Sequence, residues 1–119
     1  MQTITRLTIL SAIALLAGCA SQPPAGPPGK HLVYRDSNGA ATRQFDYPDI
    51  AFCQRVEALA GRSARCQAEA ASGLAAKATL RYNPPGILVE GHYSDLGRCR
   101  SDTGGLPAGV QLINPCTAK

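Results

Sequence analysis

Four cysteines (Cys53, Cys66, Cys99 and Cys116) are the feature that most constrains how this 119-residue chain can fold. The chain has only six aromatic residues, four Tyr and two Phe, and no Trp. A small domain with so few large side chains buries little apolar surface, so it needs covalent crosslinks. Two disulfides that each close a loop of about 15 residues would each add about 3 kcal/mol to the free energy of unfolding. We therefore expect a small disulfide-bonded domain.

A zinc site is the competing interpretation of the four cysteines. Structural zinc sites usually contain closely spaced cysteine pairs. The sequence has no Cys-x-x-Cys pair. We therefore expect disulfides, with no metal and no cofactor.

Residues 1–18 have the form of an export signal, with Arg6 before an apolar run at 7–16 that is too short to span a membrane. The segment Leu16-Ala17-Gly18-Cys19 resembles the lipobox of bacterial lipoproteins. The resemblance implies that Cys19 receives a diacylglycerol and a palmitate-type acyl chain and becomes the first residue of the mature protein. Because Ala20 follows, it also implies an outer-membrane lipoprotein, with its domain facing the periplasm. The alternative is an ordinary secretory signal followed by a cysteine by chance.

Composition divides the rest of the chain into two parts. Residues 19–29 are rich in Pro and Gly and predict an extended tether, and residues 30–119 are long enough for one domain. An exported domain meets an oxidising compartment, in which disulfides persist. Acyl chains on Cys19 would hold this domain on a membrane without spanning it.

An internal repeat organises the predicted domain. Residues 46–53 and 92–99 share the pattern Tyr-x-Asp-aliphatic-x-x-Cys. A turn glycine (Gly39 or Gly86) precedes each copy, and a second cysteine follows each copy. We interpret the domain as α+β, with two β-hairpin–helix–strand repeats that form an antiparallel sheet and two short helices.

Local patterns agree with this interpretation. Alternating apolar residues predict two hairpins, and short strands carry Cys66 and Cys116, with residues 110–114 leading to the latter. Pro48 suits the first turn of one helix, which Gly61 ends, and Ser94 suits the N-cap of the other. Asp49 and Asp95 lie where a helix dipole favours negative charge. The expected strands are 32–35, 42–47, 77–82, 87–93, 64–67 and 110–114.

Disulfide connectivity follows if the cysteines have equivalent roles in the two repeats. Cys53 then bonds to Cys66, and Cys99 bonds to Cys116, so that each bond joins a helix to the next strand. The alternative joins like positions, Cys53 with Cys99 and Cys66 with Cys116.

The mature chain carries a net charge of +3, since Arg6 belongs to the signal and the whole chain is +4. Several arginines lie near the cysteines and suggest a patch for an anionic ligand, such as lipopolysaccharide phosphates, anionic lipid or peptidoglycan carboxylates. An exported domain does not meet nucleic acid routinely. The alternative is a solvated basic surface. The patch residues are Arg55, Arg62, Arg65, Arg98 and Arg100.

The sequence indicates no catalytic residues. His31 stands at the tether boundary, and His92 shares a strand face with Glu90. His92, Ser94 and Asp95 are too close in sequence to converge as a catalytic triad. The chain also lacks an evident carboxylate pair for glycoside hydrolysis and a Gly-rich phosphate loop. We expect no enzymatic activity.

One further resemblance concerns the first hairpin. Tyr34-Arg-Asp-Ser-Asn-Gly39 and Phe45-Asp-Tyr-Pro-Asp49 are similar to a hairpin of small proteobacterial envelope domains. We expect a non-enzymatic binding module that contacts an envelope protein or an anionic envelope polymer. The alternatives are a structural component of a secretion or conjugation apparatus, and a lysozyme-type inhibitor that uses the stiff turn Asn83-Pro-Pro-Gly86.

Overall fold

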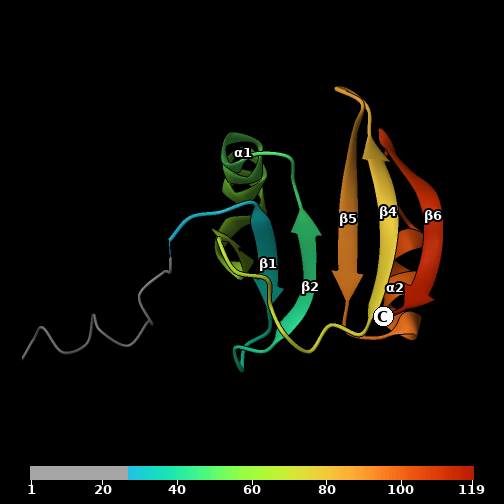
Figure 1. Cartoon of the computed structure of the whole chain (residues 1–119), viewed down its shortest axis with the longest axis horizontal. Coiled ribbons are helices and arrows are strands. Elements are labelled where there is room, and N and C mark those ends of the chain that lie inside the picture. Colours follow the sequence, from blue (N-terminus) through green and yellow to red (C-terminus); the bar gives the residue numbers. More distant parts are fainter. Residues whose placement is uncertain (1–26) are drawn as a thin grey trace, which may run out of the picture.

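A single antiparallel sheet organises residues 27–119, which the computed structural model describes (Figure 1). Its strand order is β3-β1-β2-β5-β4-β6. The expected α+β class, with an antiparallel sheet and two helices, is confirmed. The elements are β1 (His31–Arg35), β2 (Ala41–Asp46), α1 (Ile50–Ala60), η2 (Gly61–Ser63), β3 (Ala64–Gln67), β4 (Ala76–Tyr82), β5 (Ile87–Tyr93), α2 (Leu96–Thr103) and β6 (Val110–Ala118).

The predicted export signal, the lipidation site and most of the tether lie outside the described residues. Residues 27–29, which the sequence assigned to the tether, already contact the domain. Ala68 N donates a hydrogen bond to Pro27 O at 3.1 Å. Gly29 is buried, and a Cβ there would lie 2.3 Å from Ala68 Cα, so only glycine allows this close approach. No helix within residues 27–119 is long and apolar enough to cross a membrane.

Both predicted hairpins form, and their turns have local causes. In the first turn, Asp36 Oδ1 accepts hydrogen bonds from Asn38 N at 2.9 Å and Ala40 N at 3.0 Å. Gly39 completes this turn with a φ of +84°, which glycine adopts readily. In the second hairpin, Asn83 N donates to Gly109 O at 2.8 Å. The second turn is therefore tied to the segment that precedes β6.

Aspartates begin both helices. Asp49 Oδ1 accepts a hydrogen bond from Phe52 N at 2.7 Å, and Asp95 Oδ1 accepts one from Arg98 N at 2.7 Å. The expected N-cap at Ser94 was wrong, because a carboxylate one residue later makes a charge-assisted cap. Pro48 likewise precedes the N-cap rather than occupying the first turn.

The repeated sequence pattern now has a structural explanation. The Tyr of each copy is buried in the core, the Asp caps a helix, and the Cys of that helix forms a disulfide. The disulfides are Cys53–Cys66 and Cys99–Cys116, as expected. They join α1 to β3 and α2 to β6, so both helices are fastened to the same face of the sheet.

The opposite face of the sheet is covered differently. The connection between β3 and β4, residues 68–75, crosses β1 and β2 on this face, whereas α2 lies behind β4 and β6, on the helix face (Figure 1). Ala71 N in this connection donates to Gln44 Oε1 at 2.7 Å. Val33 and Gln44 are buried beneath it, whereas the part of this face over β4 and β6 is more open.

Candidate functional site

The aromatic side chains gather on the helix face of the sheet. Alternate residues of a strand point to the same face, and this spacing brings together rings from β1, β2, β4 and β5. Five of the six aromatic residues line a cavity of about 380 Å³ between the two helices. We call this cavity the aromatic cleft. Its rings are those of Tyr34, Phe45, Tyr47, Tyr82 and Tyr93.

Edge-to-face contacts fix these rings in two groups. In the first group, the ring centroids of Tyr34 and Phe45 are 5.9 Å apart at 87°, and those of Phe45 and Tyr93 are 6.1 Å apart at 88°. In the second, those of Tyr47 and Tyr82 are 5.8 Å apart at 82°. These geometries suit the quadrupoles of aromatic rings. The walls of the cleft are therefore well ordered by their own packing.

A glycine makes room for the central rings. Gly91 lies directly opposite Phe45 where β2 pairs with β5. A Cβ at Gly91 would lie 2.8 Å from the Tyr93 hydroxyl oxygen. The Tyr93 ring therefore lies over a position that has no side chain.

Three phenol groups of the cleft, those of Tyr47, Tyr82 and Tyr93, have raised pKa values and stay neutral at physiological pH. Burial raises the pKa of Tyr93 to about 12, and the nearby Asp102 carboxylate adds to the rise. Burial also raises the pKa of Tyr47 and of Tyr82. The hydroxyls of Tyr47 and Tyr82 are 3.1 Å apart and share a hydrogen bond. They therefore act as neutral hydrogen-bonding groups.

One end of the cleft is charged. The guanidinium carbon of Arg43 lies 4.3 Å from the Tyr34 ring centroid. Its Nη1 is 3.5 Å from Asp102 Oδ2, and Arg98 Nε is 3.3 Å from the same oxygen. The cleft thus combines aromatic walls with a charged pair supplied by β2 and α2. Such a mixture of apolar surface and a few placed polar groups is typical of small-molecule sites.

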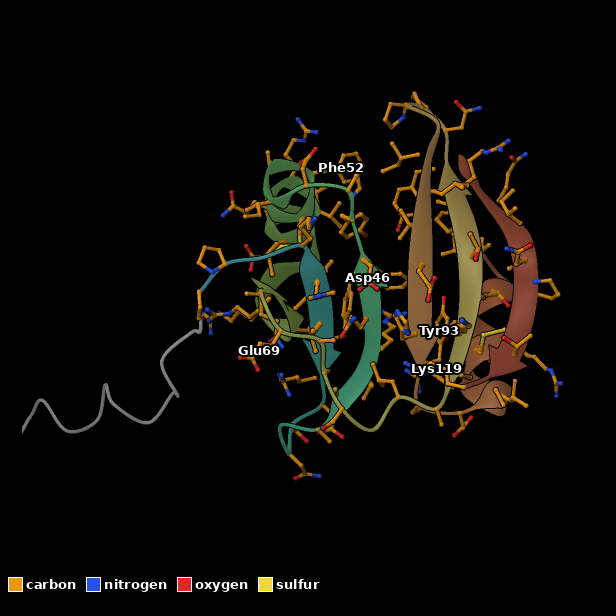
Figure 2. All side chains as sticks on the ribbon, in the orientation of Figure 1. Asp46, Phe52, Glu69, Tyr93 and Lys119 are labelled. Carbon is orange, nitrogen blue, oxygen red and sulfur yellow. A yellow bond between two sulfur atoms is a disulfide. The ribbon has the colours of Figure 1, made fainter. Side chains whose placement is uncertain are left out.

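The two histidines belong to a second cluster, on the opposite face. His31 Nδ1 is 2.6 Å from Asp46 Oδ1, and His92 Nε2 is 2.9 Å from Asp46 Oδ2. Gln44 Nε2 donates to Asp46 Oδ1 at 2.7 Å, and Lys119 Nζ is 2.9 Å from His92 Nδ1. Figure 2 places Asp46 where β2 meets β5. We call these five residues the Asp46 network.

Hydrogen bonds control the charge of this network. Burial alone would raise the pKa of the Asp46 carboxyl, but hydrogen bonds from His92, His31 and Gln44 outweigh burial and lower that pKa to about 2. Asp46 is therefore an anion at physiological pH. Within residues 27–119, no group of three His, Cys, Asp or Glu side chains is arranged to hold a metal ion.

The five arginines of the predicted patch are distributed over the molecule. Arg98 contacts Asp102 at the cleft, and Arg55 on α1 stacks over Phe52 at 5.3 Å. Arg100 is exposed on α2, and Arg62 is exposed in η2. Arg65 alternates with the buried Cys66 on β3, so it points to the face opposite the helices.

Sequence reasoning missed Arg43 and Asp102, because neither lies in a recognised motif and their contact requires α2 to pack against β2. It also missed the contact of His92 with Asp46, which requires β2 to pair with β5. The only available signal was the alternation of apolar and polar residues in 42–47 and 87–93. This alternation predicts which face of the sheet a side chain occupies, but it does not predict which strands pair.

Comparison of the whole chain with protein-family models, with curated proteins and with solved structures found no match.

Proposed function

We propose that this chain is an outer-membrane lipoprotein, anchored through Cys19, whose domain is a non-enzymatic binding module facing the periplasm. The aromatic cleft is its binding site. The observation that carries the binding role is a 380 Å³ cavity that joins five aromatic rings to an Arg–Asp pair. The lipobox-like segment at 16–19 supports the anchor.

Half-buried aromatic rings support a ligand. Tyr34, Phe45 and Tyr82 line the cleft without being fully buried. Apolar surface left in contact with water forgoes about 25 cal/mol per Å² that burial would provide. A ligand that covers these rings recovers that free energy. In a chain with only six aromatic residues, placing five around one cavity favours binding over packing alone.

We also propose that the domain consists of two equivalent repeats. Phe45 pairs with Gly91, Gln44 with His92, and Asp46 with Glu90. The alignment of residues 46–53 with 92–99 makes each position equivalent to the one 46 residues later, so it relates 44 to 90, 45 to 91 and 46 to 92. Equivalent strands β2 and β5 therefore pair about an approximate two-fold axis through Phe45 and Gly91. The cleft lies between the two copies, which explains why each contributes one wall.

The order of strands in each half also supports the repeats. β1 pairs with both β2 and β3, and β4 pairs with both β5 and β6. His31 lies opposite Asp46 just as Lys77 lies opposite His92, so the two hairpins have the same register. A duplicated hairpin–helix–strand unit produces this arrangement directly.

Photocrosslinking in intact cells tests the proposed function. A photoreactive amino acid replaces Leu106, which lines the cleft, and in a matched strain it replaces Leu59, an exposed leucine on α1. We expect a discrete product with an envelope component from position 106 and none from position 59. Mass analysis of the same purified protein should find a diacylglycerol and an acyl chain on Cys19.

Two results would contradict the proposal, and they separate its parts. Identical products from positions 106 and 59, or none from either, would remove the cleft as the site that contacts an envelope component. An unacylated Cys19 in protein recovered from the envelope would remove the anchor. Replacement of Cys19 by Ala provides the control for the lipid measurement.

A further inference from the structure

Arg43 is held in place but incompletely paired. Its guanidinium stacks on Tyr34, and its side chain is 34% exposed. Its closest anionic partner within residues 27–119 is Asp102 Oδ2 at 3.5 Å, which is longer than an ordinary N–H···O hydrogen bond. A guanidinium has five N–H donors in a planar fork that matches a carboxylate. The cleft therefore presents a prepared receptor for a carboxylate.

Asp102 presents a matching acceptor. Both Arg43 and Arg98 approach its Oδ2, at 3.5 and 3.3 Å. Among the residues that the structure describes, Oδ1 has no hydrogen-bond partner. The side chain lines the cleft and is only 22% exposed. A cationic N–H donor in the cleft can therefore reach a carboxylate oxygen that no protein group occupies.

The remaining cleft is small, and apolar side chains line it together with the polar Ser101. Tyr93, Leu80 and Val110 line it beyond the charged pair. A volume of 380 Å³ corresponds to about a dozen water molecules at roughly 30 Å³ each. This space accepts one amino-acid-sized group rather than a helix or a folded domain.

We propose that the aromatic cleft binds an α-amino acid centre that carries its ammonium and its carboxylate on the same carbon. The carboxylate binds Arg43, the ammonium binds Asp102 Oδ1, and the rest of the ligand packs against the aromatic rings. Adjacent opposite charges on one carbon match a guanidinium and a carboxylate that lie 3.5 Å apart. This inference rests on the proposed binding function and names its ligand class.

Other ligand classes fit the charged pair less well. A phosphate or a simple carboxylate bound to Arg43 would be repelled by the neighbouring Asp102 carboxylate. An amine bound to Asp102 would be repelled by Arg43 and Arg98, which both approach that carboxylate. A neutral sugar would leave Asp102 paired with Arg43 and Arg98 and would form no charge-assisted hydrogen bond in which both partners are ionised. A zwitterion satisfies both charges at once.

Calorimetric titration of the full-length mature lipoprotein in detergent tests the proposal. The probe is leucine, compared with leucinamide, which lacks the carboxylate, N-acetylleucine, which lacks the ammonium, and inorganic phosphate. We expect leucine to bind at least ten-fold more tightly than each of the others. A γ-glutamyl dipeptide, which keeps both charges on one carbon within a peptide, distinguishes a peptide source from a free amino acid. Either zwitterionic probe binding selectively supports the proposal.

Two substitutions test the assigned contacts. Arg43→Met should weaken leucine binding at least ten-fold, and Asp102→Asn should remove the preference for leucine over N-acetylleucine. Arg62→Met removes an exposed arginine outside the cleft and should change nothing. Near-ultraviolet circular dichroism verifies that each variant is folded. Because Asp102→Asn preserves side-chain shape, it keeps the test valid if Arg43→Met does not fold.

Equal binding of leucine and N-acetylleucine, or of leucine and leucinamide, would overturn the assignment, as would no binding of either zwitterionic probe. If any of these results were obtained together with a cleft-specific crosslink in cells, the amino acid assignment would be wrong but the proposed binding function would stand. Selective leucine binding without such a crosslink would instead defeat the envelope role.

Discussion

The two faces of the β2–β5 pair are built from alternate residues of the same strands, yet they are stabilised in different ways. Phe45 and Tyr93 point to the helix face, where aromatic packing and two disulfides dominate. Asp46 and His92 point to the opposite face, where a charged hydrogen-bond network dominates. Stability from apolar burial is insensitive to pH, whereas stability from the Asp46 network depends on protonation. The aromatic cleft therefore lies on the face whose apolar packing does not depend on protonation.

The covering of the opposite face depends on one buried amide. Gln44 is 2% exposed, and its side chain uses both ends. Its Nε2 donates to Asp46 Oδ1 at 2.7 Å, and its Oε1 accepts from Ala71 N at 2.7 Å. Because buried polar groups must be hydrogen-bonded, Gln44 fixes the connection between β3 and β4 over the sheet. On the helix face, Cys66 N likewise donates a hydrogen bond to Glu57 Oε2 at 2.8 Å, but here the disulfide Cys53–Cys66 joins α1 to β3 covalently as well.

The largest effect should come from removing the disulfide bonds. Replacing all four disulfide cysteines by Ala should leave the domain unfolded, because each lost disulfide costs about 2–5 kcal/mol in a small exported domain. A small domain has a total free energy of unfolding of only about 5–15 kcal/mol. Urea denaturation followed by circular dichroism measures the loss. Single-pair variants at Cys53/Cys66 and Cys99/Cys116 should lose about 3 kcal/mol each.

Cooperative unfolding of the four-alanine variant within about 1 kcal/mol of the wild type would contradict the covalent account of the helix face. The wild type reduced with dithiothreitol provides a control, because it loses the same bonds without any substitution.

A cavity on the helix face should have the next largest effect. Leu32 is fully buried in the core around Cys53–Cys66. Leu32→Ala should lower the free energy of unfolding by about 3 kcal/mol through lost burial and a residual cavity. Leu59→Ala, the same change at a side chain that is 88% exposed, should alter it by less than about 0.5 kcal/mol. Similar losses for the two variants in urea denaturation would show that burial does not stabilise this face.

How far the sequence predicts the structure depends on how local each feature is. The turn at 36–39, the end of α1 at Gly61 and the hairpin strands were predictable, because their signals lie within a few residues. The disulfides were predictable because the repeated pattern gave the cysteines equivalent roles. The last strand was predicted to carry Cys116, with residues 110–114 leading to it, and β6 runs from Val110 through Pro115 to Ala118. β6 lies at the edge of the sheet, where the missing N–H donor of Pro115 is tolerated.

The candidate site was largely beyond the sequence, because it depends on contacts between distant segments. His92 and Asp46 are 46 residues apart and meet only because β2 pairs with β5. Arg43 meets Asp102 only because α2 packs on the same face as the side chain of Arg43. Alternation of residues along a strand fixes which face a side chain occupies, and the order of strands in the sheet decides its neighbours.

The smallest effect should come from the charge of Asp46. Its pKa is about 2 in the folded chain and 3.8 without these contacts, so its stabilising contribution is complete above about pH 4. As the pH falls from 4 towards 2, Asp46 becomes protonated and the contribution is lost. The shift corresponds to about 1–2 kcal/mol after allowance for a side chain that is 31% exposed. Asp46→Asn should therefore lower stability at pH 7 by about this amount and reduce its decline in acid.

Urea denaturation at pH 7, 4 and 2.5 measures both effects in one series. Glu69→Gln, at an exposed carboxylate in the connection between β3 and β4, should retain the acid dependence of the wild type. Because the Asp46 network lies on the face opposite the cleft, leucine binding at pH 7 should be the same in Asp46→Asn and in the wild type. An Asp46→Asn variant with an unchanged decline between pH 4 and 2.5 would contradict the role of this carboxylate. Weaker leucine binding in that variant would show that the two faces are coupled through β2 and β5.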